Sequence, residues 1–360
     1  MQLHLVGGFL GSGKTTAIIE AARLLMSEGF KVGVVTNDQG KYLVDTAFVR
    51  LSDLPAVEVT GGCFCCNFND LNEKLVQLVS EIKPDVIFAE SVGSCADIVA
   101  TVVKPLGNLD DDRIQPTSFS VFVDGRLLKR WYAGEELPFS KDVVYIFEKQ
   151  IEEAGMLVIN KMDLLSPGDI QLLEERVGAQ GDDILFRFQN SLSKKSVQGW
   201  VNALRSGAVP LPGSSLEIDY DRYGRGEAHM AWLDETLTLS IQQDDPRMVI
   251  IDWLNTLLGT LKEKGFGVGH LKFVLQSGEW STKLSFTGVD EMDWEDAVPE
   301  IALADIQVLV NARVETTAAE LRQIILLSLQ QTQEKHTFSY EETNVEFFHP
   351  GEPKPTYRIS

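Results

Sequence analysis

Three cysteines lie within four positions of the chain, in the stretch TGGCFCCNFND at residues 60–70. Cys63, Cys65 and Cys66 can supply thiolates, which bind soft or borderline ions such as Zn²⁺. Three sulfur ligands leave a tetrahedral ion one position short, and the spacing differs from the paired C-x-x-C of structural zinc sites. The pattern predicts a site for a transferable metal ion, with a redox switch and buried inert cysteines as alternatives.

The fourth position of such a site could take water, a side chain of another protein, or Cys95. We expect a helix to begin near Asp70, directly after the cysteine loop. The N-terminus of a helix lowers the pKa of nearby thiols, so this placement favours the thiolate form that binds metal.

A glycine-rich loop, GFLGSGKT at residues 8–15, matches the G-x-x-x-x-G-K-[ST] pattern between an expected strand and an expected helix. Glycines let backbone N–H groups close around phosphate oxygens, and the helix N-terminus adds its dipole. Lys14 would reach the outer phosphates, and the Thr15 hydroxyl would ligate Mg²⁺. The predicted phosphate-binding residues are Gly8, Gly11, Ser12, Gly13, Lys14, Thr15 and Thr16.

A base-recognition motif, INKMD, ends a later expected strand. Asn160, Lys161 and Asp163 form N-K-x-D, in which the Asp163 carboxylate can accept hydrogen bonds from guanine N1–H and the guanine amino group. Adenine cannot offer both donors, and a buried polar group left unpaired costs about 1–3 kcal/mol, so the motif predicts guanine specificity. Asn190 and Ser191, in QNSLSKKS, are the predicted contacts of a further purine-binding loop.

Two acidic loops should also face the phosphates. One is TNDQGKYLVD, which contains Asp38 and Asp45, although Asp45 could instead be a solvated surface acid. The other follows the DVIFAE strand, where Glu90 would hold Mg²⁺ directly or through water and Gly93 would let the backbone approach a γ-phosphate. We predict Lys14, Glu90 and Asp38 as catalytic residues, and Thr15 and Glu90 as Mg²⁺ ligands.

Apolar runs alternate with helical patterns through the first half of the chain. This alternation predicts a parallel sheet covered by helices, with ligands at the carboxyl ends of the strands, where each motif falls. The expected strands lie at residues 2–9, 31–38, 84–91, 118–125 and 155–163, and the expected helices include 15–29 and 70–82.

The predicted fold class is α/β, with a P-loop GTPase domain followed by a smaller C-terminal α+β domain. We place the first domain at residues 1–207 and the second at 232–335. Residues 208–231 are rich in Gly, Pro, Ser and Asp and are predicted to be a linker. Residues 336–360, with prolines and scattered charge, are expected to be a poorly ordered tail.

Composition narrows the choice of partners. A formal net charge of −21 argues against a general nucleic-acid binder, because phosphate contact requires a basic surface. No apolar run approaches the length of a membrane span, and the first residues lack the pattern of a signal peptide. We therefore expect a cytoplasmic protein with no nucleic-acid or membrane partner, in which clustered cysteines stay reduced.

The motifs GGFLGSGKTT, NDQGKYLVD, GGCFCC, ESVG and NKMD, in this order, resemble those of the CobW-type GTPases, relatives of HypB and UreG. The resemblance covers residues 1–205 strongly and implies GTP hydrolysis coupled to delivery of a metal, zinc or cobalt, to a client protein. It matches Cys63, Cys65 and Cys66 to the metal-binding thiols. It matches the nucleotide site to Lys14, Thr15, Glu90 and Asp163.

The leading hypothesis is therefore a Mg²⁺-dependent GTPase that serves as a metallochaperone or metalloenzyme-maturation factor. No arginine finger or positioned glutamine is evident, so intrinsic hydrolysis should be slow, and a homodimer across the nucleotide face could complete the site. One alternative is a GTPase switch that remodels a corrinoid- or metal-dependent client without carrying metal. A small-molecule kinase of the P-loop class with a structural zinc is another, against which N-K-x-D argues.

Overall fold

The computed structural model describes residues 1–37, 54–109, 114–179, 185–278, 280–288, 294–300 and 305–360. The described chain forms two compact units. The first contains the residues up to Gly226 together with Glu352–Ser360, and the second contains Glu227–Gly351. Within the described ranges, no helix is both long and apolar enough to span a membrane.

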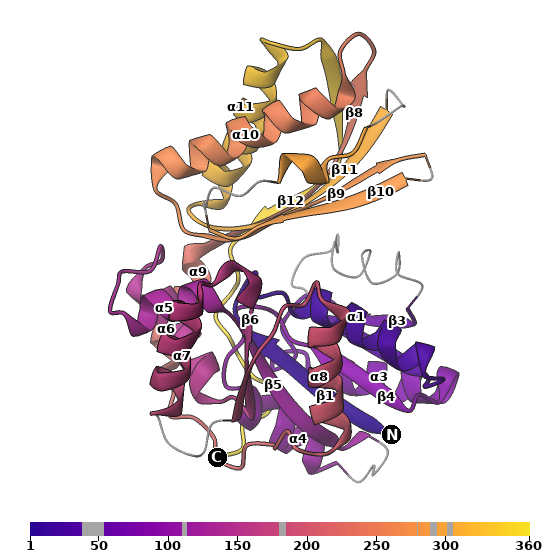
Figure 1. Ribbon diagram of the computed structural model, residues 1–360, viewed down its shortest axis with the longest axis vertical. Coiled ribbons are helices and arrows are strands. Elements are labelled where there is room, and N and C mark those ends of the chain that lie inside the picture. Colours follow the sequence, from indigo (N-terminus) through magenta and orange to yellow (C-terminus); the bar gives the residue numbers. More distant parts are fainter. Residues whose placement is uncertain (38–53, 110–113, 180–184, 279, 289–293, 301–304) are drawn as a thin grey trace. The chain divides into compact units, whose positions relative to one another are not determined.

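The first unit is built on a seven-stranded sheet in the order β3-β2-β4-β1-β5-β6-β7 (Figure 1). Every neighbouring pair of strands is parallel, as the βα alternation of the sequence predicts. The strands are β1 Gln2–Gly8, β2 Val32–Asn37, β3 Ala56–Val59, β4 Val86–Glu90, β5 Pro116–Asp124, β6 Met156–Asn160 and β7 Leu185–Phe188.

Helices cover both faces of this sheet. Helices α1 and α8 share a hydrophobic core with one face, to which Val34 contributes. Gly33, the preceding residue, lies against Leu78 of α3, so α3 covers the opposite face. The helices are α1 Lys14–Ser27, α3 Phe68–Ile82, α4 Lys104–Gly107, α5 Gly125–Tyr132, α6 Lys141–Glu152, α7 Pro167–Gly178, α8 Lys194–Arg205 and α9 Tyr220–His229, with a π-helical turn at Val99–Val103 and a 3₁₀ turn at Met162–Leu164.

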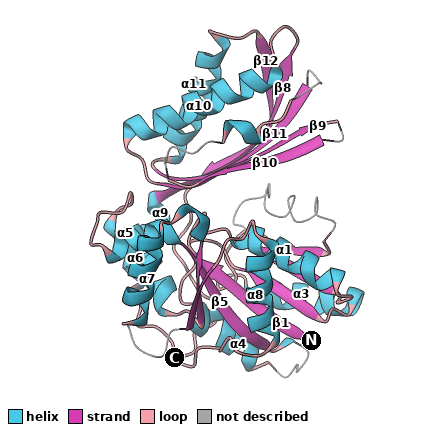
Figure 2. Cartoon of the chain, viewed as in Figure 1, coloured by secondary structure: helices cyan, strands magenta, loops and turns pink. Residues whose placement is uncertain are grey.

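The second unit is an antiparallel five-stranded sheet, in the order β10-β9-β11-β8-β12, with helices packed on it (Figure 2). Alternate residues of its strands form one core with α10 and α11, which confirms the predicted α+β class. The elements are β8 Met230–Ile241, α10 Pro246–Lys264, β9 Val268–Ser277, β10 Trp280–Phe286, the 3₁₀ turn Glu295–Ala297, β11 Asp305–Glu315, α11 Ala318–Gln333 and β12 Phe338–Phe348.

The expectation of a poorly ordered tail at residues 336–360 is wrong. Strand β12 pairs along β8, and Phe338 and Tyr340 pack against the core of the second unit. It is an edge strand rich in polar and charged residues, so its composition resembles that of a disordered segment, although Phe338 and Tyr340 point to the core. Residues beyond it, Glu352–Ser360, belong to the first unit.

The segment predicted as a linker, 208–231, also contains regular structure. Helix α9 spans Tyr220–His229 within it. The buried Tyr223 packs with Ala96 and Ile146 in a small hydrophobic cluster of the first unit. This aromatic contact orders a stretch that its Gly and Asp content alone would make irregular.

Candidate functional site

The glycine-rich loop joins the carboxyl end of β1 to the first turn of α1. Gly8, Gly11 and Gly13 all have positive φ, of 126°, 69° and 90°. A Cβ at Gly8 would lie 2.1 Å from the backbone oxygen of Phe122. Only glycine fits a backbone this close to a neighbouring strand. The glycines thus allow the tight turn that places backbone N–H groups at the N-terminus of α1, where anions bind.

Lys14 and Thr15, the first residues of α1, are both buried at this loop. The Lys14 ammonium donates hydrogen bonds to the carbonyl oxygens of Gly8, at 2.8 Å, and Phe9, at 3.2 Å. Its charge therefore sits on the loop itself, where a phosphate would be held. Ser12 is buried and Thr16 is half-buried beside them.

The predicted Mg²⁺ residues come together at the junction of β1 and β4. The Thr15 hydroxyl donates to Glu90 Oε1 at 2.9 Å, and both side chains are buried. The two strands are adjacent, with Val6 opposite Glu90, which brings the end of β4 to the loop. A hydroxyl and a carboxylate oxygen are hard ligands that suit Mg²⁺. Asp38 and Asp45 lie outside the described residues.

Asn160, at the end of β6, connects the N-K-x-D motif to the phosphate loop. Its Nδ2 donates to the Ser12 carbonyl oxygen at 2.7 Å. Its Oδ1 accepts from the Ser191 backbone N–H at 3.1 Å and from the Ser191 hydroxyl at 2.8 Å. A Cβ at Gly13 would lie 2.4 Å from the same Nδ2, which explains the glycine there. Three predicted nucleotide-binding segments thus meet at one buried amide.

Lys161 follows in the left-handed conformation, with φ 59°, and its Nζ lies 2.9 Å from Asp124 Oδ2. Asp124 is buried at the end of β5, opposite Asn160. Burial by itself raises the pKa of this carboxyl, but the Arg126 hydrogen bonds and the Lys161 charge lower it to about 2. The carboxylate therefore stays ionised and fixes the Lys161 side chain.

Asp124 belongs to none of the motifs recognised in the sequence. Its signal was an acidic residue at the carboxyl end of the strand SFSVFVDG, which neighbours the INKMD strand in the sheet. The ends of neighbouring parallel strands lie together, so such a pair could have been proposed.

The remaining base-recognition candidates lie around the same strand end. Asp163 is exposed in the 3₁₀ turn Met162–Leu164. The Met162 N–H donates to the Gln189 carbonyl oxygen at 3.1 Å, which holds that turn against the loop after β7. The Asn190 side-chain oxygen accepts a hydrogen bond from the Leu192 N–H at 2.8 Å, so this side chain stabilises the turn that contains it.

Gly93 brings the loop after β4 onto the phosphate loop. A Cβ at Gly93 would lie 3.0 Å from the Leu10 Cα and 3.1 Å from its N. The buried Gln150 of α6 donates to the carbonyl oxygens of Gly93, at 3.0 Å, and Cys95, at 2.8 Å. One side chain thus fixes both the glycine at the phosphate loop and the fourth cysteine.

The three clustered cysteines converge at the N-terminus of α3. Their Sγ atoms are 2.8 Å apart for Cys63 and Cys65, 3.3 Å for Cys63 and Cys66, and 3.8 Å for Cys65 and Cys66. The backbone N–H groups of Cys66 and Asn67 both donate to the Cys63 carbonyl oxygen. Ligands about 2.3 Å from a tetrahedral Zn²⁺ lie about 3.8 Å from one another, so small side-chain shifts would admit the ion.

The cluster favours one thiolate among several thiols. Hydrogen bonds from Cys65, Cys66 and Cys95 hold the pKa of Cys63 well below its ordinary value. The hydrogen bonds that Cys65 and Cys66 make with the Cys63 sulfur raise the pKa of both thiols, that of Cys66 to about 11. Cys63 and Cys65 are buried and Cys66 is half-buried. These three thiols form no disulfide, and Cys95 shares hydrogen bonds with Cys63 and Cys65.

Asn37, the last residue of β2, holds the cysteine loop and was also missed. Its Nδ2 donates to the carbonyl oxygens of Val59, at 3.1 Å, and Gly62, at 2.8 Å. Its Oδ1 accepts from the Phe64 N–H at 2.9 Å. Asn37 directly precedes the acidic loop of the sequence, so the residue before that loop is hydrogen-bonded to the cysteine loop.

The model of the CobW/HypB/UreG nucleotide-binding domain matches residues 2–184, which include the phosphate loop, the cysteines and N-K-x-D. The chain belongs to this family. The match confirms the resemblance drawn from the motifs. It contains strands β1 to β6 and ends after helix α7, just before β7.

Several characterised proteins are similar to the chain. The zinc-regulated GTPase metalloprotein activator 1 of Dictyostelium discoideum is 24% identical over 58% of this chain and 53% of its own length. The zinc chaperone YeiR of Escherichia coli is 30% identical over 51% of this chain and 53% of its own length. The urease accessory protein UreG of Aliarcobacter butzleri is 26% identical over 55% of this chain and 96% of its own length.

The chain thus spans about half the length of the first two of these relatives. The HypB structure from Archaeoglobus fulgidus covers 57% of this chain and 89% of its own, at 18% identity and a TM-score of 0.41.

Proposed function

We propose that this CobW/HypB/UreG-family protein is a cytoplasmic metallochaperone that couples Mg²⁺-dependent GTP hydrolysis to delivery of Zn²⁺ or Co²⁺ to a client metalloenzyme. The observation that carries the proposal is the cluster of three free thiols, within 3.8 Å of one another, at the N-terminus of α3. The names of two relatives, a zinc-regulated GTPase activator and a zinc chaperone, support zinc as the first choice.

In this proposal the nucleotide is held by its two ends. The loop from Gly8 to Thr15 binds the phosphates, Thr15 and Glu90 hold Mg²⁺, and Asp163 accepts the guanine donors. Catalysis of phosphoryl transfer depends on positioning and on positive charge near the phosphates. Because the sequence offers no evident arginine finger or positioned glutamine, hydrolysis by a single copy is slow. A second copy across the nucleotide face could complete the site, so the hydrolysis rate per molecule would rise with protein concentration.

Two side chains offer a physical route for the coupling. Asn37 holds the cysteine loop and directly precedes the acidic loop, while Gln150 holds both Gly93 and Cys95. GTP binding would reorganise the loops at the phosphates and, through these two amides, change the thiol cluster. The thiols would then gain or lose their metal according to the bound nucleotide.

The first experiment measures Zn²⁺ and Co²⁺ affinity of the full chain without nucleotide, with GDP and with a non-hydrolysable GTP analogue. A variant with Cys63, Cys65 and Cys66 all changed to Ser tests the ligands. The matched control is Lys14→Ala, which keeps the thiols but weakens phosphate binding. We expect stoichiometric metal that depends on nucleotide in the natural protein, ignores nucleotide in the Lys14 variant, and is lost in the Ser variant.

Two other outcomes would contradict the proposal in different ways. Metal bound equally in all nucleotide states would indicate a structural zinc site with no delivery role. No stoichiometric metal would favour the alternative function, a GTPase switch that remodels a corrinoid- or metal-dependent client without carrying metal. Binding of such a client that survives the triple Ser change would support that alternative.

A further inference from the structure

The segment Glu352–Ser360 lies on the cysteine loop, far from it in sequence. The Lys354 backbone N–H donates to Cys66 Sγ at 3.3 Å. The Thr356 N–H donates to the Cys65 carbonyl oxygen at 2.8 Å, and the Thr356 hydroxyl donates to the Cys66 carbonyl oxygen at 2.8 Å. Two of the three clustered cysteines are thus hydrogen-bonded by this segment, one of them at its sulfur.

An aromatic contact fixes the same segment to the helix that follows the cysteines. The Tyr357 ring meets the Phe68 ring edge-on, with centroids 5.2 Å apart and planes at 86°. Phe68 is buried and is the first residue of α3. Edge-to-face pairs of this kind add stability beyond the area they bury, so the segment has a defined position over the loop.

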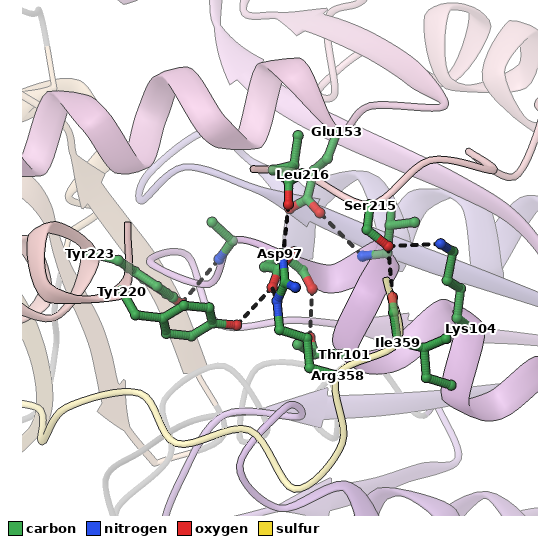
Figure 3. A network of polar contacts seen from close by, with 12 residues as sticks. Asp97, Thr101, Lys104, Glu153, Ser215, Leu216, Tyr220, Tyr223, Arg358 and Ile359 are labelled. Carbon is green, nitrogen blue, oxygen red and sulfur yellow. Dashed lines mark hydrogen bonds and ion pairs between the residues drawn. The ribbon is translucent and has the colours of Figure 1, made fainter. Parts of the chain in front are cut away.

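Arg358 anchors the segment to a buried carboxylate (Figure 3). Its Nε lies 2.7 Å from Asp97 Oδ2, and its Nη2 donates to the Leu216 carbonyl oxygen at 2.8 Å. Asp97 is fully buried, has a positive φ of 63°, and also accepts a hydrogen bond from the Tyr220 hydroxyl at 2.7 Å. Only the Asp97 carboxylate of this pair is buried, but the ion pair and the hydrogen bond to Leu216 together fix the Arg358 side chain in one position.

The neighbouring residue continues the attachment. The Ile359 N–H donates to the Ala100 carbonyl oxygen at 2.9 Å, and the Ser215 hydroxyl donates to the Ile359 carbonyl oxygen at 2.7 Å. Lys104 donates to that same hydroxyl at 2.8 Å, as Figure 3 shows. The segment therefore spans from the cysteine loop to the stretch that follows Cys95.

We propose that Lys354–Arg358 is the outer hydrogen-bonding shell of the thiolate site, with the Lys354 amide donating to metal-bound Cys66 and Arg358 as its positioning residue. This inference rests on the proposed metal-binding function. A divalent ion bound by three thiolates carries net negative charge, which an amide N–H directed at sulfur stabilises. Groups that hydrogen-bond metal ligands typically change metal affinity by about 10- to 100-fold.

The chain offers a sharp pair of variants at one position. Lys354 lies between Pro353 and Pro355, and a residue before proline is already restricted to extended backbone. Lys354→Pro therefore removes the donor N–H and places the ring Cδ against Cys66 Sγ, whereas Lys354→Ala removes the charged side chain and keeps the donor.

The experiment measures Zn²⁺ affinity of the full chain by competition with a chromophoric chelator. We expect about a 10-fold loss of affinity in Lys354→Pro and no change in Lys354→Ala. Alkylation of Cys66 in metal-free protein supplies a second readout, which should accelerate in Arg358→Ala. Arg205→Ala, which removes an exposed ion pair with Glu28, is the matched control for that variant. GDP affinity should stay unchanged in all four variants.

The outcomes separate this inference from the function on which it rests. If the natural protein binds Zn²⁺ and Lys354→Pro binds it equally, the outer shell is overturned and the metallochaperone proposal stands. Equal loss in both Lys354 variants would also overturn it, because the side-chain charge would then be responsible. If the natural protein binds no Zn²⁺, the metallochaperone proposal falls, and with it this one.

Discussion

At the scale of single residues, the nucleotide site is held by buried polar side chains that touch more than one motif. Asn160 hydrogen-bonds Ser12 and Ser191, and Asp124 holds Lys161. Such groups are costly to remove, since each deletion leaves buried partners unsatisfied. The position of the base-recognition motif relative to the phosphate loop therefore depends on a few atoms.

The first prediction concerns Asn160. Asn160→Ala leaves the Ser12 carbonyl oxygen and the Ser191 hydroxyl without this partner, so the free energy of unfolding should fall by about 1–3 kcal/mol. GTP affinity should fall as well. Urea unfolding and nucleotide titration measure both effects. Asn202→Ala, at an exposed amide on α8 that accepts from Gln198, should change neither, and an equal loss there would contradict the explanation.

The second prediction is a pH dependence of stability. The pKa of Asp124 is lowered from 3.8 to about 2 in the folded protein. A depressed carboxyl pKa stabilises the fold above the unfolded-state value, and this contribution is lost as the pH falls toward the folded-state value. Asp124→Asn should therefore cost on the order of 2 kcal/mol near neutral pH. The gap should shrink between about pH 4 and pH 2, and a constant gap would contradict the assignment.

At the scale of elements, the site depends on how closely β1 and β5 approach. Gly8 has a φ of 126°, and a Cβ there would meet the backbone of Phe122. Backbone atoms cannot move aside as a side chain can, so the turn from β1 into α1 admits no larger residue.

The third prediction follows from this contact. Gly8→Ala should lower the free energy of unfolding by about 2–5 kcal/mol, from unfavourable φ and overpacking together. Gly178→Ala is the matched control, because Gly178 ends α7 and a Cβ there meets nothing within 4 Å. That change should be neutral or stabilising by up to about 1 kcal/mol. Thermal unfolding measures the stability of both variants. Equal shifts of the melting temperature would contradict the explanation that Gly8 is required by its contact with Phe122.

At the scale of the whole molecule, the chain enters the second unit at Glu227 and returns to the first at Glu352. The second unit has its own core, made by β8–β12 with α10 and α11. Among the described residues, the returning segment donates to and accepts from residues of the first unit, such as Cys66 and Asp97. Loss of this segment should therefore perturb the first unit.

The fourth prediction tests the loss of this segment. Deleting residues 352–360 should increase amide hydrogen exchange at residues 63–68 and 97–101, because their partners in the segment are lost. Exchange in β8, β9 and β11 should stay as it is in the full chain. Faster exchange confined to the second unit, or none in the cysteine loop, would contradict the described attachment.

The sequence predicted the features that are written in local patterns. Strand and helix periodicity gave the parallel sheet, and the fixed spacing of the glycine loop and N-K-x-D gave the two ends of the nucleotide site. The cysteine cluster could also be identified, because its ligands lie within four positions. By contrast, β12 was missed, since the polar and charged residues of this edge strand resemble a disordered segment.

What the sequence by itself determined is therefore the fold class and the family, together with the candidate residues of both proposed sites, because short-range spacing encodes them. Only the tertiary structure decided which distant residues support those sites. The pairs Asp124 and Lys161, Asn160 and Ser12, and Lys354 and Cys66 are separated along the chain and share no periodic signal. Such contacts arise from where strand ends and returning segments meet in space, which no local pattern specifies.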